Sequence, residues 1–182
     1  MTNALTRRAA LKSIAGLSIA PGLSHAQPAT GLHVVPARAD RTGQPHHVAG
    51  VDSYIDFKVL TAETGGGSFV IENRDMARGG PPRHIHYAQE EWFYLVDGGE
   101  IVMEIGDRKL TLKPGDSVLA PRNVPHVWAY VGDRPGRMVI AFTPAGKMED
   151  FFTQQGKSTA ATPDPRIFET HGMKVVGPPL KV

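Results

Sequence analysis

The chain has 182 residues, of which 41% are apolar and 21% charged, and its formal net charge is +2. These values are typical of a globular protein, and the length suffices for one domain with a substantial core. The sequence has no cysteine, which excludes disulfides, thiolate zinc fingers and thiol nucleophiles. It also has no basic patch of the kind that indicates nucleic-acid binding.

The first 26 residues have the pattern of an export signal. Arg7 and Arg8 precede an uncharged, moderately apolar stretch (13–23), and Ser24-His25-Ala26 forms a small-x-small cleavage site. The apolar stretch is too short to span a bilayer. The arginine pair resembles the twin-arginine signal, which bacteria use to export folded proteins. We therefore expect export by the twin-arginine machinery, cleavage near Ala26, and a periplasmic mature chain without membrane contact.

Residues 27–50 are polar and interrupted by three prolines, which predicts an extended N-terminal arm. The following region, 51–145, contains short apolar stretches separated by Gly-, Pro- and Asp-rich turn signals. Many short strands at this spacing predict an all-β antiparallel sandwich or barrel. The predicted strands cover residues 51–60, 67–73, 83–87, 91–97, 100–105, 109–113, 117–120, 126–131 and 136–143.

The region 146–182 predicts a helical C-terminal extension. A first helix begins at residue 148, has apolar residues at helical spacing and ends at Gly156. A second helix has an aspartate as its N-cap and a proline in its first turn, and it ends at Gly172. We expect both helices to pack against the outside of the sheets.

A group of histidines and glutamates predicts a metal site. His84 and His86 lie two apart on a predicted strand, so their side chains point to the same face. A glutamate follows at Glu90 or Glu91, and a later strand begins with His126. Neutral imidazoles and one carboxylate form a mixed nitrogen and oxygen site that suits a first-row transition metal.

Strand alternation also predicts an apolar wall around these ligands. Such a wall with a few polar groups is typical of a small-molecule site. An octahedral metal with four protein ligands keeps two positions open, where substrate or oxygen could bind. Three other histidines (His46, His47 and His171) are expected in solvent, with a lid role for His46 or His47 as the alternative. The candidate wall residues are Phe93, Leu95, Met103, Trp128, Tyr130 and Phe142.

The first of two motifs resembles that of the cupin superfamily, commonly written G-x5-H-x-H-x(3,4)-E-x6-G. The segment from His84 to Gly98 fits this pattern, whereas Gly79 lies five positions before His84 instead of six. Within the motif, the spacing to Gly98 selects Glu91 as the carboxylate ligand. Glu90 is then expected to be exposed or to lie beside the site.

The second cupin motif, G-x5-P-x-G-x2-H-x3-N, maps onto Gly115, Pro121 and His126. The chain departs from it at Asn123, where glycine is usual, and at Tyr130, where asparagine is usual. Asparagine tolerates a left-handed backbone better than most residues, so the first change is mild. The second is expected to alter a hydrogen bond near the site.

Beyond the motifs, PPRHIH, EEWFYLVDGGE, APRNVPH and FTPAGKMEDFF resemble single-domain cupins of the quercetin 2,3-dioxygenase-like type. This resemblance implies a jelly-roll β-barrel (a double-stranded β-helix), often homodimeric, with one metal held by His84, His86, Glu91 and His126. It also implies a dioxygenase that oxidises a small enolic or phenolic substrate with O2, with Glu91 changing from ligand to base. The alternatives are a metal-dependent isomerase, lyase or hydrolase, and a non-catalytic periplasmic module that binds a metal or a small molecule.

The export route bears on the identity of the metal. A protein that folds before export takes up its metal in the cytoplasm, away from the free copper and zinc of the periplasm. Because raw affinity favours copper and zinc over manganese and iron, we expect one divalent Mn or Fe per chain, with Ni, Co, Cu and Zn as alternatives.

Overall fold

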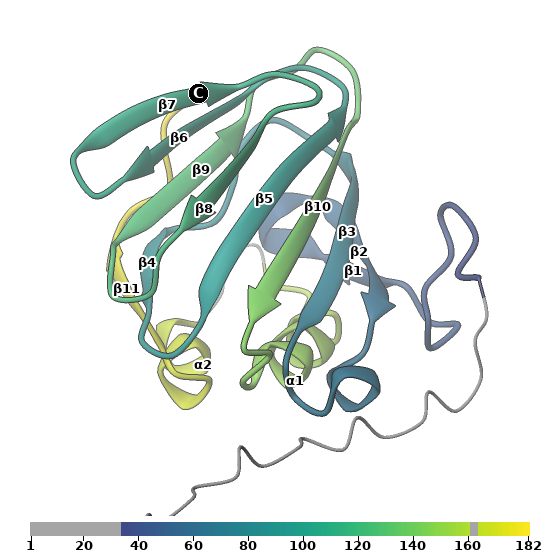
Figure 1. Cartoon of the computed structure of the whole chain (residues 1–182). Helices are drawn as coiled ribbons and strands as arrows, with labels where there is room; N and C mark the ends of the chain where they lie inside the picture. Colours follow the sequence, from purple (N-terminus) through teal and green to yellow (C-terminus); the bar gives the residue numbers. More distant parts are fainter. Residues whose placement is uncertain (1–33, 161–163) are drawn as a thin grey trace, which may run out of the picture.

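The computed structural model describes residues 34–160 and 164–182. The expected export signal (1–26) and the first part of the arm therefore lie outside the described residues. The described part consists of two antiparallel β-sheets that face each other, with two short α-helices at one end (Figure 1). No helix in these residues is long and apolar enough to cross a membrane.

The two sheets form the all-β jelly roll that the sequence predicts. The first sheet contains, in spatial order, β1 (His46–Val48), β2 (Ser53–Val59), β3 (Phe69–Met76), β10 (Gly136–Thr143), β5 (Glu90–Asp97) and β8 (Ser117–Ala120). The second sheet contains β11 (Met173–Gly177), β4 (Arg83–His86), β9 (His126–Tyr130), β6 (Ile101–Ile105) and β7 (Arg108–Leu112). Short 3₁₀ helices, Ala49–Val51 and Thr61–Thr64, flank β2.

The core lies between the inner faces of the two sheets. Alternation along β3 and β5 turns every second side chain inward, so Phe69, Ile71, Phe93 and Leu95 are fully buried. Register between strands aligns these residues in rows. For example, Phe93 of β5 pairs with Ile140 of β10, which pairs in turn with Ile71 of β3.

Both predicted C-terminal helices are present, as α1 (Met148–Gln155) and α2 (Pro165–Thr170). Asp164 caps α2 by accepting a hydrogen bond from the backbone N–H of Arg166 at 3.0 Å. The expected position on the outside of the sheets is wrong. The helices cover one end of the barrel (Figure 1), because the apolar residues Met148, Phe151 and Phe168 are buried against the core that this end would otherwise expose.

Two strands lie where the sequence predicts none. β1 belongs to the expected arm but pairs with β2, and β11 lies in the expected helical extension but pairs with β4. The sequence does not predict them because both strands are short and are flanked by residues that indicate turns, such as Pro45 and Gly172. The pairing of β11 with β4 has a direct effect on the metal site, because Met173 is opposite His86 and Val175 is opposite His84.

Tyr130 has a structural role away from the predicted metal ligands. It is fully buried, and its hydroxyl donates to the carbonyl of Arg134 and accepts from the N–H of Gly99, both at 2.6 Å. It lies four residues after His126 on β9, a separation of about 13 Å along a strand. The expected effect of Tyr130 on a hydrogen bond near the site is therefore wrong, because its bonds lie at the opposite end of β9.

We expect Tyr130→Phe to destabilise the protein without weakening metal binding. Loss of the hydroxyl leaves the buried groups of Gly99 and Arg134 without their partner, which costs about 1–3 kcal/mol of unfolding free energy. Urea denaturation of the metal-free protein measures this cost, and metal titration of the folded variant provides the control. A variant as stable as wild type would contradict the assigned role.

Candidate metal centre

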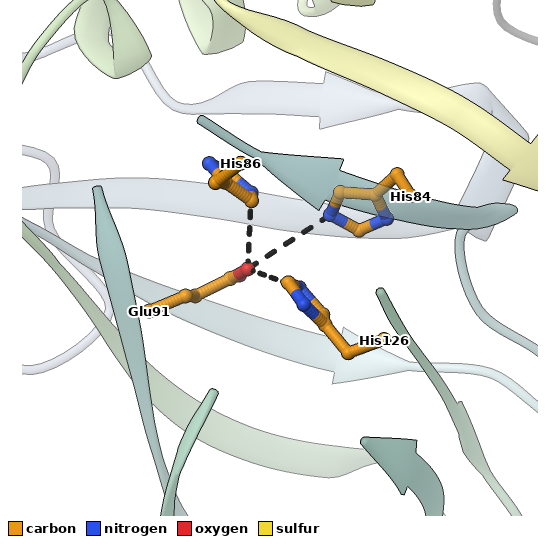
Figure 2. Close-up of side chains that lie close together, drawn as sticks. All are labelled: His84, His86, Glu91 and His126. Atoms are coloured by element: carbon orange, nitrogen blue, oxygen red, sulfur yellow. Dashed lines mark hydrogen bonds and ion pairs between the residues drawn. The ribbon is translucent and has the colours of Figure 1, made fainter. Parts of the chain in front are cut away.

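Three strands bring the four predicted ligands together (Figure 2). His84 and His86 come from β4, Glu91 from β5 and His126 from β9. His84 pairs directly with His126 across the β4–β9 ladder, and alternation places His86 on the same face of β4. All four side chains are buried between the sheets, and one ligand atom from each lies within 4.8 Å of all the others.

The carboxylate of Glu91 is at the centre of the cluster. Its Oε2 lies 2.8 Å from Nε2 of His126, 3.2 Å from Nε2 of His86 and 3.9 Å from Nε2 of His84. Three imidazole nitrogens thus converge on one carboxylate oxygen (Figure 2). This donor set of three neutral nitrogens and one oxygen suits a divalent transition metal.

Backbone carbonyls orient two of the imidazole rings. Nδ1 of His84 lies 2.8 Å from the carbonyl of Pro82, and Nδ1 of His126 lies 3.2 Å from that of Val124. When Nδ1 carries the proton and donates it to these carbonyls, Nε2 keeps its lone pair for the metal. The third ring, His86, is 2% exposed, and its Nε2 faces the carboxylate of Glu91 while its Nδ1 has no hydrogen-bond partner among the described residues. A buried imidazole with so few partners fits a metal ligand.

The protonation states also favour metal binding. Burial alone would raise the pKa of the Glu91 carboxyl, but its contacts with the three imidazoles outweigh burial and hold that pKa well below its usual range. Burial lowers the pKa of His84. The cluster therefore favours an ionised carboxylate and a neutral imidazole, which are the forms that bind metals.

Glu90 lies outside the cluster. Its carboxylate accepts two hydrogen bonds from Arg122, at 2.5 and 2.6 Å, on the surface. These hydrogen bonds lower the pKa of Glu90. Of the two candidate carboxylates, only Glu91 reaches the histidines.

Two close backbone contacts position segments near the site. Asn123 has the left-handed conformation that glycine usually provides, with φ of 62°, and its N–H donates to the carbonyl of His86 at 2.7 Å. Gly80 runs so close to β9 that a Cβ atom would lie 2.0 Å from the carbonyl oxygen of Trp128. Both contacts position the segments beside the ligands.

A mainly apolar cavity of about 160 Å³ borders His84, His86 and Glu91. Strands of both sheets contribute to it, and α1 and α2 line it from the end of the barrel that they cover. Its remaining lining residues are Val48, Val51, Ile55, Ile71, Asn73, Gly80, Pro81, Pro82, Trp128, Ile140, Phe142, Met148, Phe151, Phe152, Gln155, Phe168, Met173 and Pro179.

Two of the six predicted wall residues, Trp128 and Phe142, line this cavity. The other four (Phe93, Leu95, Met103 and Tyr130) do not, and they are packed in the core. The predictions for these four are wrong because alternation gives the face of a strand but not which strands of that face border the cavity. Phe93 and Leu95 lie in the same rows as Ile71 and Asn73, but at these two rows the cavity is bordered by β3 and not by β5. Phe93 instead packs its edge against the ring of His126.

Other lining residues were missed by the sequence analysis. Asn73 follows Phe69 and Ile71 on the inward face of β3, and a buried polar residue directly after two apolar ones in this alternation is a signal that the sequence contains. Phe151 and Phe152 belong to a predicted helix, but amphipathic spacing does not show what its apolar face covers.

The remaining histidines are not all in solvent. His46 stacks on Phe57 at a centroid distance of 4.1 Å, and His171 is buried beside Phe151. The solvated prediction is wrong for both, because each ring packs on an aromatic neighbour. Of these three histidines, only His47 fits the prediction of a solvated side chain, because it contacts Asp52 at the surface. None of the three lines the cavity.

Comparison with known proteins supports the cupin superfamily. Residues 75–142 match the Cupin_2 family, a cupin domain, and this range contains all four clustered ligands. An uncharacterized protein from Methanocaldococcus jannaschii, MJ1618, is 30% identical over 67 residues, which cover 37% of this chain and 53% of that protein. The match thus spans about half the length of that relative.

Solved structures with similarity to this chain include two from bacteria. An RmlC-like cupin from Shewanella frigidimarina is 21% identical, covers 59% of this chain and 87% of its own, and has a TM-score of 0.47. KdgF from Halomonas sp. is 22% identical, covers 50% of this chain and 78% of its own, and has a TM-score of 0.44.

Two neighbouring glutamates provide a matched test of the metal centre. Glu91→Gln removes the charged ligand while keeping the shape of the side chain, so we expect it to lose most bound metal. Glu90→Gln, which changes the adjacent surface carboxylate, should keep it. The measurement is the metal content per folded chain after dialysis against a weak chelator. Equal loss in both variants, or in neither, would contradict the assignment of Glu91.

Proposed function

We propose that the protein is a metal-dependent dioxygenase that oxidises a small enolic or phenolic compound with O2. The observation that carries this proposal is the buried cluster of three histidines and Glu91 on the wall of an apolar cavity. A divalent transition ion held by these four residues would supply Lewis-acid and redox chemistry at that wall. The residues of the chain provide binding, orientation and exclusion of water.

The cavity wall favours a flat, mainly apolar substrate. Trp128 and Phe142 present aromatic surface beside the ligands, and Phe151 and Phe168 of the two helices cover the end of the barrel. This arrangement separates the substrate from bulk water and strengthens electrostatic interactions at the metal. It is consistent with an oxygen atom of the substrate facing the metal and its carbon skeleton contacting the aromatic side chains.

The electrostatics of Glu91 constrain its part in the reaction. The pKa of its carboxyl lies well below the usual range, so Glu91 is ionised, which is the form that would bind the metal. It becomes an effective base, able to take the proton of a substrate hydroxyl, only when the carboxylate moves away from the imidazoles.

The size of the cavity narrows the substrate class. A cavity of about 150 Å³ lined by apolar side chains holds one benzene molecule, and the cavity here has about 160 Å³. A compound with one ring, or an open-chain diketone of similar size, fits this volume. A three-ring flavonol exceeds this volume.

We expect the metal-loaded protein to consume O2 with one-ring catechols or small diketones and to act more slowly on three-ring flavonols. An oxygen electrode measures uptake after loading with Fe²⁺, Mn²⁺, Ni²⁺ or Cu²⁺, and Glu90→Gln is the control that keeps the cluster intact. Conversion of a substrate without O2 uptake would instead indicate an isomerase, lyase or hydrolase. Tight binding without turnover would indicate a binding module.

We further propose that the mature chain is a periplasmic homodimer that contains Mn or Fe. The arginine pair near the N-terminus supports export, and the resemblance to single-domain cupins supports dimerisation. Exposed Trp92 and Leu119 also pair across β5 and the edge strand β8. Protein purified from native periplasm should contain Mn or Fe and have the mass of a dimer by light scattering. Full occupancy by copper or zinc, or a monomer mass, would contradict the respective part of this proposal.

A further inference from the structure

Asn73 is a buried polar residue in the apolar part of the cavity wall. It lies on β3, is 2% exposed and borders the cavity. Its side-chain oxygen has no hydrogen-bond partner among the described residues. A buried polar group without a partner destabilises the folded state, so Asn73 is not explained by the stability of the fold.

The cavity distinguishes Asn73 from other buried polar groups of this kind. Several described residues have a buried side-chain atom without a partner, but only His86 and Asn73 among them line the cavity. His86 belongs to the metal cluster. Asn73 is therefore the unpartnered group that remains available for a ligand in the same cavity.

Strand register places Asn73 away from the metal cluster. Asn73 pairs with Met138, which pairs with Leu95, whereas Glu91 pairs with Phe142. The two rows lie four residues apart, or about 13 Å along the strands. Lining residues between these rows, such as Ile71 and Ile140, are apolar. The cavity thus has a polar group at each of two separated positions and an apolar wall between them.

We propose that Asn73 binds the substrate by accepting a hydrogen bond from a hydroxyl or N–H group remote from the oxygen that faces the metal. This inference rests on the proposed function, which places the substrate in the cavity. No Lys or Arg of the described residues lines the cavity, so the remote group is not matched to a carboxylate. The substrate class is a one-ring compound with an enolic or phenolic oxygen at one end and a neutral donor group at the other.

Two probes of similar shape test this proposal. 4-(2-Hydroxyethyl)catechol and 4-propylcatechol share the adjacent hydroxyls that bind a metal, and they differ in having a hydroxyl or a methyl group at the end of the side chain. Calorimetric titration under anaerobic conditions, with the protein loaded with redox-inert Zn²⁺, measures binding without turnover. We expect wild type to bind the hydroxyethyl compound about ten-fold more tightly than the propyl compound.

Asn73→Leu should abolish or reverse this preference, and Asn73→Ala provides a second variant that leaves room for the probes. Gln89→Leu is the matched control, because Gln89 is also buried and its Oε1 also lacks a partner, yet it does not line the cavity. This control should keep the wild-type preference. Thermal melting should show Asn73→Leu at least as stable as wild type, since the substitution removes an unsatisfied buried group.

A wild-type protein without preference for the hydroxyethyl compound, or Asn73→Leu with an unchanged preference, would overturn the proposal. The ratio of two affinities within one variant is insensitive to moderate changes in folding. Because O2 is absent from the titration, failure of O2 uptake would reject the dioxygenase and leave the role of Asn73 standing. If O2 uptake occurs but wild type and Asn73→Leu have the same preference between the two probes, only the role of Asn73 is rejected.

Discussion

The contact between Glu91 and His126 is the constraint on which the site depends. With Nδ1 of His126 donating to a backbone carbonyl, Nε2 presents a lone pair to Oε2 of Glu91 at 2.8 Å. Two acceptor atoms at this distance repel each other unless a proton or a cation lies between them. The same condition applies to His84, whose Nδ1 faces the carbonyl of Pro82. A buried carboxylate surrounded in this way requires positive charge, which a metal ion or protonated imidazoles provide.

The rest of the fold serves to hold these groups in place. β4, β5 and β9 belong to two different sheets, so the cluster exists only while the sheets are packed together. The helices and β11 then complete the surroundings, since α1 and α2 contribute Phe151 and Phe168 to the cavity and β11 pairs with the strand that carries two ligands. The C-terminal segment therefore supports the site both as cover and as a neighbouring strand.

Much of this could be predicted from the sequence, and the failures have physical reasons. His84 and His86 were predicted because period 2 fixes a common face, and the motif spacing separated Glu91 from Glu90. The exclusion of Phe93 and Leu95 from the cavity could not be predicted, since alternation does not show which strands of a face border a cavity. The position of α1 could not be predicted either, because an amphipathic helix reveals which face is buried but not what it covers.

The pairing of β11 with β4 has a consequence for biosynthesis. The strand carrying His84 and His86 is made early, but its neighbour β11 ends at residue 177. During translation β4 has a free edge until these late residues leave the ribosome, and the aromatic residues of α1 and α2 remain uncovered for almost as long. The ligand sphere is thus complete only after β11 has been made, well after the strands that supply its residues. Metal uptake by the finished site would then follow the synthesis of β11 and not that of β4.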